Sequence, residues 1–163
     1  MDTLVTPFSV TLVICLGMAV LGNVLTGNSL KEWYAGLQKP RWQIPTWAFV
    51  GVAIITYIVD GIILYRLLTV VTDLTARLVA LTAMIVVMLY NELWNYGFLG
   101  QRSTFTGFIG IVAFVAPLVM LEVILIAYDP PSALLFAAYV AWVVLYDIPW
   151  AYTLWKLNPD VRR

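Results

Sequence analysis

Residues 105–127 read FTGFIGIVAFVAPLVMLEVILIA, and Glu122 is the only ionisable side chain in this run. A bilayer core about 30 Å thick needs about 20 apolar residues, because a helix rises about 1.5 Å per residue. Four other stretches of the chain are comparably long and apolar. We therefore predict five membrane-spanning helices, with ends uncertain by a few residues, over residues 6–26, 46–68, 77–99, 105–127 and 132–156.

The composition supports a membrane protein. Of the 163 residues, 63% are hydrophobic and 11% are charged, and the mean hydropathy is +0.93, far outside the range of soluble proteins. Strands of a membrane β-barrel would appear as alternating segments of about ten residues, whereas these runs are longer and uniformly apolar. We predict an all-α membrane protein: residues 1–163 form a single domain, a five-transmembrane-helix bundle with a structured loop between helices 1 and 2.

Several functional classes are excluded by residues that the chain lacks. It contains no histidine, which excludes His-based zinc sites, Ser-His triads and His-ligated haem. The lone Cys15 gives no disulfide framework and reads best as a small buried hydrophobe. The net charge is +0 and no basic patch suggests nucleic acid. We expect no metal, no cofactor and no nucleic-acid partner.

Carboxylates inside the predicted spans are the strongest functional signal. Asp60, Glu92 and Asp147 each lie well inside a span, near the bilayer midplane, whereas Glu122 lies nearer the end of its helix. A charge at the bilayer centre costs roughly 2.5–3.5 kcal/mol on insertion scales, so such residues face a protein interior or a wet cavity. Pro149 opens the helix beside Asp147 by removing a backbone donor. We predict a polar cavity inside the bundle.

The helix over residues 77–99 carries a face suited to a flat ligand. Asn91, Trp94, Asn95 and Phe98 follow the i, i+3, i+4, i+7 spacing that places them together. Aromatic rings beside two amides suit a flat molecule with polar edges. The alternative is that this face only packs against its neighbours.

The segment between the first two spans is rich in aromatic residues. Residues 30–45 read LKEWYAGLQKPRWQIP, and a structured loop of this length is often a functional lid. The alternative is a short helix lying among the lipid headgroups.

Three motifs now carry a resemblance to a known family. The loop fits a W…L-x-K-P-x-W-x-P-P signature, the third span fits N-x-x-W-S-x-x-F-F-G followed by an arginine, and the fifth fits P-Y-L-x-W with a later L-N. The chain thus resembles the TspO family, also called translocator protein, tryptophan-rich sensory protein or peripheral-type benzodiazepine receptor. The matching residues are Trp33, Leu37, Lys39, Pro40, Trp42, Pro45, Asn91, Trp94, Phe98, Gly100, Arg102, Tyr139, Ala141, Trp142, Leu157 and Asn158.

The sequence also departs from that pattern, as a divergent member would. Ala53 aligns with a tryptophan of the family, Asn95 with a serine, and the second loop proline is replaced. An L-N pair in the fifth span is lost around residues 147–150. The acids Asp60, Glu92 and Asp147 are not part of the family pattern.

The resemblance implies a bundle whose first loop folds over a cavity for large, flat, apolar ligands: porphyrins, sterols and synthetic aromatic compounds. The family is often dimeric, so a homodimer is also implied. Tyr57, next to Asp60, and Tyr146 are added to the positions that the motifs supply. The predicted ligand-binding residues are Trp33, Trp42, Tyr57, Asn91, Trp94, Asn95, Phe98, Tyr139, Trp142 and Tyr146.

Three functions are compatible with the sequence. The first is binding, with or without transport, of a flat lipophile such as a tetrapyrrole, a sterol or an isoprenoid. The alternative is a membrane enzyme in which Asp60, Glu92 and Asp147 act as general acids that isomerise or cyclise an isoprenoid-like substrate. The third is a sensory or structural partner of other membrane proteins.

The basic residues predict the orientation in the membrane. Five spans place the termini on opposite sides. Arg66 and Arg77 fall on one side, and the C-terminal side carries seven basic residues: Lys31, Lys39, Arg41, Arg102, Lys156, Arg162 and Arg163. Because cytoplasmic loops are enriched in Lys and Arg, we predict a cytoplasmic C-terminus and an external N-terminus. Cysteine labelling at each end checks this, and termini on one side would refute the five-span topology.

Overall fold

The computed structural model describes residues 2–159, and every regular element in that range is helical. Two π-helical turns, η2 and η3, interrupt the helices near the cavity described below. The elements are α1 (Asp2–Thr26), α2 (Ser29–Glu32), η1 (Tyr34–Gly36), α3 (Thr46–Thr69), α4 (Leu74–Asn95), η2 (Tyr96–Gly100), α5 (Thr104–Tyr128), α6 (Pro130–Trp142), η3 (Val143–Asp147) and α7 (Ile148–Leu157).

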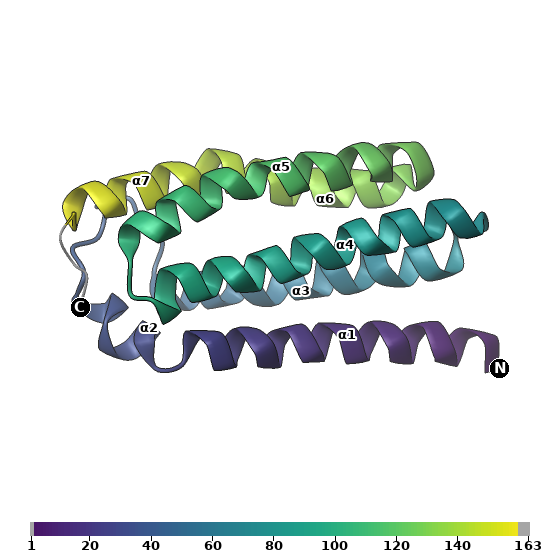
Figure 1. The fold of residues 1–163 in the computed structure, drawn as a ribbon, viewed down its shortest axis with the longest axis horizontal. Coiled ribbons are helices and arrows are strands. Elements are labelled where there is room, and N and C mark those ends of the chain that lie inside the picture. Colours follow the sequence, from purple (N-terminus) through teal and green to yellow (C-terminus); the bar gives the residue numbers. More distant parts are fainter. Residues whose placement is uncertain (1, 160–163) are drawn as a thin grey trace.

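Five helical segments of the described residues are long and apolar enough to cross a membrane, which confirms the predicted five-helix membrane bundle (Figure 1). Their ends fall within three residues of the predicted ones. The spans are Thr6–Thr26, Thr46–Thr69, Leu74–Gly100, Thr104–Tyr128 and Pro130–Leu157. The fifth span is continuous through α6, η3 and α7.

Local chemistry explains where the helices begin and end. The Asp73 side chain accepts a hydrogen bond from the backbone N–H of Ala76 at 2.7 Å and caps α4. Ser103 caps α5 in the same way, through the N–H of Thr106 at 3.2 Å. Gly27, with φ of 54°, follows the last residue of α1 in the left-handed conformation that glycine adopts without strain.

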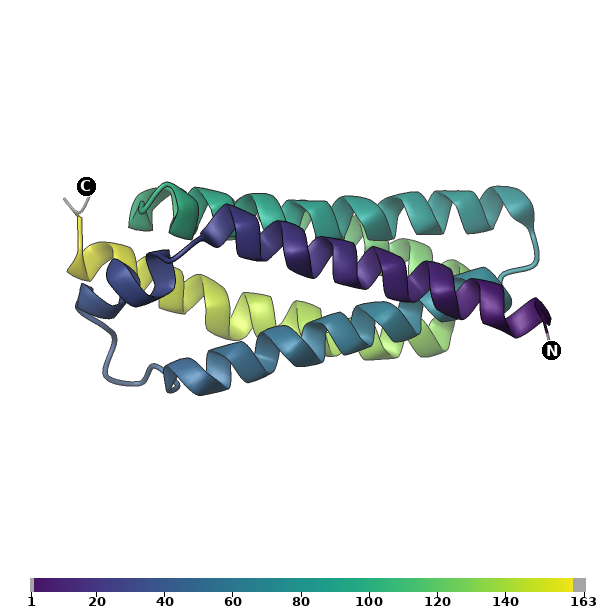
Figure 2. The same cartoon turned by 90° about the horizontal axis from the view of Figure 1, so that it is seen from below.

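The bundle has an inner packed side and an outer lipid-facing side. Helix α5 packs along α4, α6 and α7, while α1 packs along α3 and α4 (Figures 1 and 2). Phe114 and Phe136 are fully buried between these helices, whereas Ile58, Val123 and Leu134 are exposed apolar side chains. Side chains that face lipid are expected to be apolar, as these are.

The termini lie at opposite ends of the bundle (Figure 1). Arg66, near the end of α3, and Arg77, at the start of α4, lie at the end that holds the N-terminus. The first loop, the α4–α5 connection and α7 place five basic residues at the other end: Lys31, Lys39, Arg41, Arg102 and Lys156. Arg162 and Arg163 lie outside the described residues. Which end faces the cytoplasm stays a prediction.

A buried ion pair joins α3 to the start of α6. The Arg66 guanidinium donates to both carboxylate oxygens of Asp129, at 2.7 and 3.0 Å, and the Ser132 hydroxyl donates to the same carboxylate. Asp129 is 2% exposed. The hydrogen bonds from Arg66 lower the pKa of Asp129 below its ordinary value of 3.8, against the effect of burial.

We predict that Asp129→Asn lowers the free energy of unfolding by about 1–3 kcal/mol at neutral pH, because a charge-assisted pair is lost. A lowered folded-state pKa means that ionised Asp129 stabilises the fold above its ordinary pKa. That contribution is lost as the pH falls through the lowered value, so parent and variant converge below about pH 4. Thermal unfolding in detergent measures both effects.

The control is Glu32→Gln. It breaks the Glu32–Arg102 pair, whose side chains are 55% and 39% exposed. An exposed pair contributes about 0–1 kcal/mol. Equal losses in the two variants would contradict a special role for the buried pair.

Candidate ligand-binding cavity

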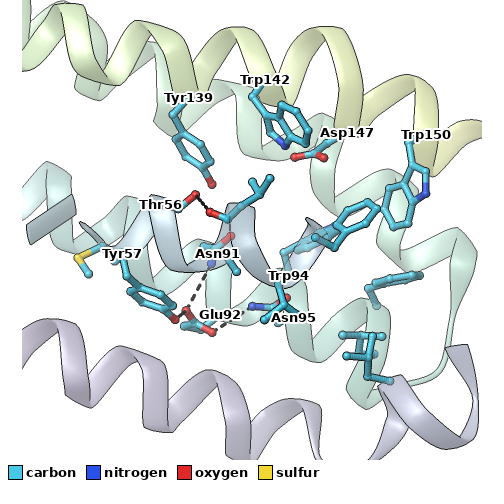
Figure 3. Close-up of a pocket in the computed structure, with 18 of the residues that line it drawn as sticks. Thr56, Tyr57, Asn91, Glu92, Trp94, Asn95, Tyr139, Trp142, Asp147 and Trp150 are labelled. Atoms are coloured by element: carbon cyan, nitrogen blue, oxygen red, sulfur yellow. Dashed lines mark hydrogen bonds between the residues drawn. The ribbon is translucent and has the colours of Figure 1, made fainter. Parts of the chain in front are cut away.

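One cavity of about 220 Å³ lies inside the bundle, between α3, α4, η2 and the fifth span (Figure 3). It extends from Tyr34 in the first loop to Asp60 on α3, about 20 Å along the helix from Thr46. Its walls are Leu30, Tyr34, Thr46, Phe49, Val50, Val52, Ala53, Thr56, Tyr57, Asp60, Met88, Asn91, Glu92, Trp94, Asn95, Phe98, Leu99, Tyr139, Trp142, Asp147 and Trp150.

The structure brings most of the predicted site residues to this cavity. The lining includes the three predicted acids and seven of the predicted ligand contacts: Tyr57, Asn91, Trp94, Asn95, Phe98, Tyr139 and Trp142. Their binding role stays a prediction. Glu122, the fourth acid, is not part of the lining.

Three predicted contacts lie outside the lining. Trp33 is buried and meets the Phe98 ring edge-on at 5.6 Å. Trp42 is 48% exposed and meets Tyr146 at 5.5 Å. Tyr146 in turn stacks on Trp142 at 4.5 Å. These residues support the wall and the loop from behind rather than facing the cavity.

Sequence reasoning missed several wall residues. Thr46, Phe49, Ala53 and Thr56 recur every three or four positions on α3 and share the cavity face, so the helical period could have found them. Ala53, where the family carries tryptophan, leaves open space at this wall.

Two aromatic residues at the loop end of the cavity were also missed. Trp150 is 2% exposed, and its indole N–H donates to the Gln43 side chain at 2.9 Å. Tyr34 contacts the rings of Phe98 and Trp150. Burial raises the pKa of Tyr34 to about 12, against a smaller effect of Gln43, so its hydroxyl stays neutral. No sequence motif marked either residue as a cavity residue: Tyr34 lies in the first loop, and Trp150 lies where the fifth span departs from the family pattern.

Glu92 accepts hydrogen bonds from side chains of α3 and α4 that also line the cavity. It is 1% exposed and accepts hydrogen bonds from the Tyr57 hydroxyl, from Asn95 at 3.1 Å and from Asn91 at 3.3 Å (Figure 3). The carboxylate also faces Gly22 of α1, where a Cβ atom would collide with it. Glycine is therefore required for α1 to approach this closely.

Asp60 and Asp147 are different, because they receive few donors. Asp60 is 6% exposed, and within residues 6–159 no side chain donates a hydrogen bond to it. Asp147 points into the cavity beside the Trp142 indole (Figure 3). Tyr139 projects between these walls and lies within electrostatic reach of all three acids.

A π-helical turn places Asp147. Residues Val143–Asp147 form η3, and α7 resumes at Ile148. Pro149 has no backbone N–H to donate to this turn. The helix nevertheless stays continuous from η3 into α7, so an opening of the backbone beside Asp147 stays a prediction. Such π-turns often occur at functional sites.

The first loop contributes Leu30 and Tyr34 to the cavity and is tied to the C-terminal end of the bundle. Asn158 accepts from the backbone N–H of Gln38 at 3.0 Å, and its amide donates to the Gln38 carbonyl at 2.9 Å. The backbone N–H of Ile44 donates to the Tyr146 hydroxyl at 2.9 Å. The loop is therefore held at this end of the bundle by hydrogen bonds, and its role as a lid stays a prediction.

The cavity combines apolar and polar side chains. Eight of its 21 lining residues are aromatic, and its polar groups are acids, amides and hydroxyls. No group of three His, Cys, Asp or Glu side chains able to hold a metal ion occurs in the described part of the chain.

Five apolar spans around an internal cavity define a small multi-pass integral membrane protein. The sequence model of the TspO/MBR family matches residues 10–155, and the chain belongs to this family. It is 26% identical over 146 residues to the tryptophan-rich protein TspO of Chlorobaculum tepidum, covering 90% of this chain and 92% of the relative. It is 28% identical over 136 residues to the tryptophan-rich protein TspO of Archaeoglobus fulgidus, covering 83% and 86%. The predicted family is confirmed.

We predict that Asn158→Ala loosens the lid. Two hydrogen bonds to Gln38 are lost, each worth about 0.5–1.5 kcal/mol, so local opening increases about 5- to 100-fold. Hydrogen exchange of the amides of residues 37–44 measures this. Gln38→Ala is the matched control, because Asn158 bonds only the backbone of Gln38. Equal exchange in the two variants would contradict the lid anchor.

Proposed function

We propose that this TspO-family protein binds a flat lipophilic small molecule in the cavity beneath the first loop. The chemical classes considered are tetrapyrroles, sterols and isoprenoids. Transport of the bound molecule is a separate step that the same cavity would serve. The observation that supports binding most directly is the group of aromatic side chains that line a cavity beside an anchored loop.

The aromatic rings of the walls are arranged in layers. Trp94 and Phe98 stack at 5.6 Å with planes 20° apart on α4 and η2. Across the cavity, Trp142 stacks on Tyr146 with planes 25° apart. The Trp94 indole N–H already donates to the Gly107 carbonyl at 2.8 Å, which fixes the ring. A flat molecule inserted between these walls gains stacking without reordering them.

The size of the cavity limits which ligands can fit inside it. Its volume of about 220 Å³ is below the roughly 300–1,000 Å³ of typical ligand sites. A compact ring system therefore fits the closed form. A tetrapyrrole or a sterol requires the lid or the walls to move.

An enzyme is the second candidate, and the acids favour it. Asp60, Glu92 and Asp147 line one cavity, and two of them lack the donors that hold Glu92. In an acid-catalysed isomerase or cyclase of an isoprenoid-like substrate, Asp147→Asn should lower turnover about 10²–10⁴-fold while binding is kept. Binding without turnover in the parent protein would reject this candidate.

We predict that a flat aromatic compound quenches the intrinsic tryptophan fluorescence saturably. An aromatic stack is worth roughly 0.5–1.5 kcal/mol, so Trp94→Ala or Trp142→Ala weakens binding up to about tenfold. Trp42→Ala acts through the lid and changes the dissociation rate more than the fold. Fluorescence titration and stopped-flow measurements give the two quantities.

The control for this series is Trp155→Ala. Trp155 stacks on Phe108 at 5.3 Å and is not part of the cavity lining. Its loss should leave affinity unchanged. Unchanged affinity in both Trp94→Ala and Trp142→Ala would show that the ligand binds elsewhere.

A further inference from the structure

The ionisable groups with a possible charge in the cavity are all acidic. Three carboxylates line it, and within the described residues no Lys or Arg does; the chain has no histidine. At the loop end, the Lys39 ammonium lies 4.9 Å from the centre of the Tyr34 ring and donates to the Ala35 carbonyl. Lys39 itself is not part of the cavity lining.

The three acids do not have equal roles. Glu92 accepts three side-chain hydrogen bonds and fits against Gly22, so its acceptor positions are occupied by the protein. It belongs to the frame that joins α1, α3 and α4. Fewer donors reach the other two acids: no side chain of residues 6–159 donates to Asp60, and the Trp142 indole is the neighbour that can donate to Asp147.

The Asp60 carboxylate can accept hydrogen bonds but receives none from the described side chains. Its side chain lines the cavity at 6% exposure, and no described side chain donates to it. Burying a polar group without a partner is unfavourable, and burying a charge without one is more so. A ligand that carries a hydrogen-bond donor or a positive charge would give Asp60 the partner that the protein does not provide.

Asp147 lies on another wall of the same cavity, on the fifth span, with the Trp142 indole beside it (Figure 3). The Tyr139 ring stands near both aspartates, and Phe49 and Trp150 continue the aromatic wall. Aromatic faces attract cations, and the attraction is stronger where water is excluded. Carboxylates and aromatic rings thus favour the same charge on a ligand.

We propose that the ligand of this cavity is a lipophilic cation: a compact flat ring system carrying a protonated amine or quaternary ammonium, held by Asp60 and Asp147. This rests on the proposed function, because it names the ligand class for the same cavity. A ligand with a carboxylate would add a fourth negative group to the chamber. Such a ligand binds only with its carboxylate outside, near Lys39.

The test compares three probes of one shape. They are 9-aminoacridine, a cation at neutral pH, acridine, which is neutral, and acridine-9-carboxylate, an anion. Binding to the full chain in phosphatidylcholine nanodiscs is measured by equilibrium dialysis against empty nanodiscs. We expect the cation to bind about tenfold or more tightly than acridine, and the anion to bind most weakly.

Variants locate the charge recognition. Asp60→Asn and Asp147→Asn should each reduce the affinity for 9-aminoacridine about tenfold and leave that for acridine nearly unchanged. Glu122→Gln is the matched control, since it removes a carboxylate from a membrane span outside the cavity lining. Within each variant, the affinity for 9-aminoacridine is divided by that for acridine, so a general loss of binding does not count as a loss of charge recognition. The comparison of probes on the parent protein does not depend on any variant folding.

The outcomes are distinguishable. If acridine or the carboxylate binds as tightly as the cation, the charge assignment is overturned and the aromatic cavity stands. A cation preference that survives both aspartate substitutions also overturns it. If none of the three rings binds saturably, the proposed function fails together with the inference.

Discussion

A carboxylate in the middle of a bilayer needs hydrogen-bond donors from the protein or a polar cavity beside it, because lipid supplies none. Glu92 shows how this chain meets that constraint. Its donors come from Tyr57 on α3 and from two asparagines on α4, and α1 closes over it at Gly22. Three of the five spans are therefore fixed around one acid. The open face of that arrangement, bounded by α3, α4 and the fifth span, is the cavity.

The lid depends on a second set of polar contacts at the end of the bundle. Asn158 binds the backbone of Gln38, and Trp150 binds the side chain of Gln43. Both anchors come from α7 or the residue that follows it, so the loop and the last helix close the cavity together. The π-turn η3 precedes α7 and carries Asp147. The loop is thus anchored just after the segment that carries Asp147.

The sequence predicted the spans well because apolar length and turn residues are local properties. It also predicted that α4 presents Asn91, Trp94, Asn95 and Phe98 together, because one helix has a fixed period. It could not show that Trp33 and Trp42 lie behind the wall, because both belong to the first loop, whose path is set by its contacts with η2 and η3. Nor could it separate a partnered acid from an unpartnered one, because the donors to Glu92 include a residue from another helix.

Two sets of residues consequently control two different quantities. The side chains that face the cavity set which molecule is bound, through ring contact and through the open acceptors of Asp60 and Asp147. The residues that hold the loop, Asn158 and Tyr146 among them, touch the lid and not the ligand space, so they set how often the cavity opens. Equilibrium selectivity follows from the first set and exchange rates from the second. A ligand larger than the closed cavity couples the two, because it must displace the lid to be bound at all.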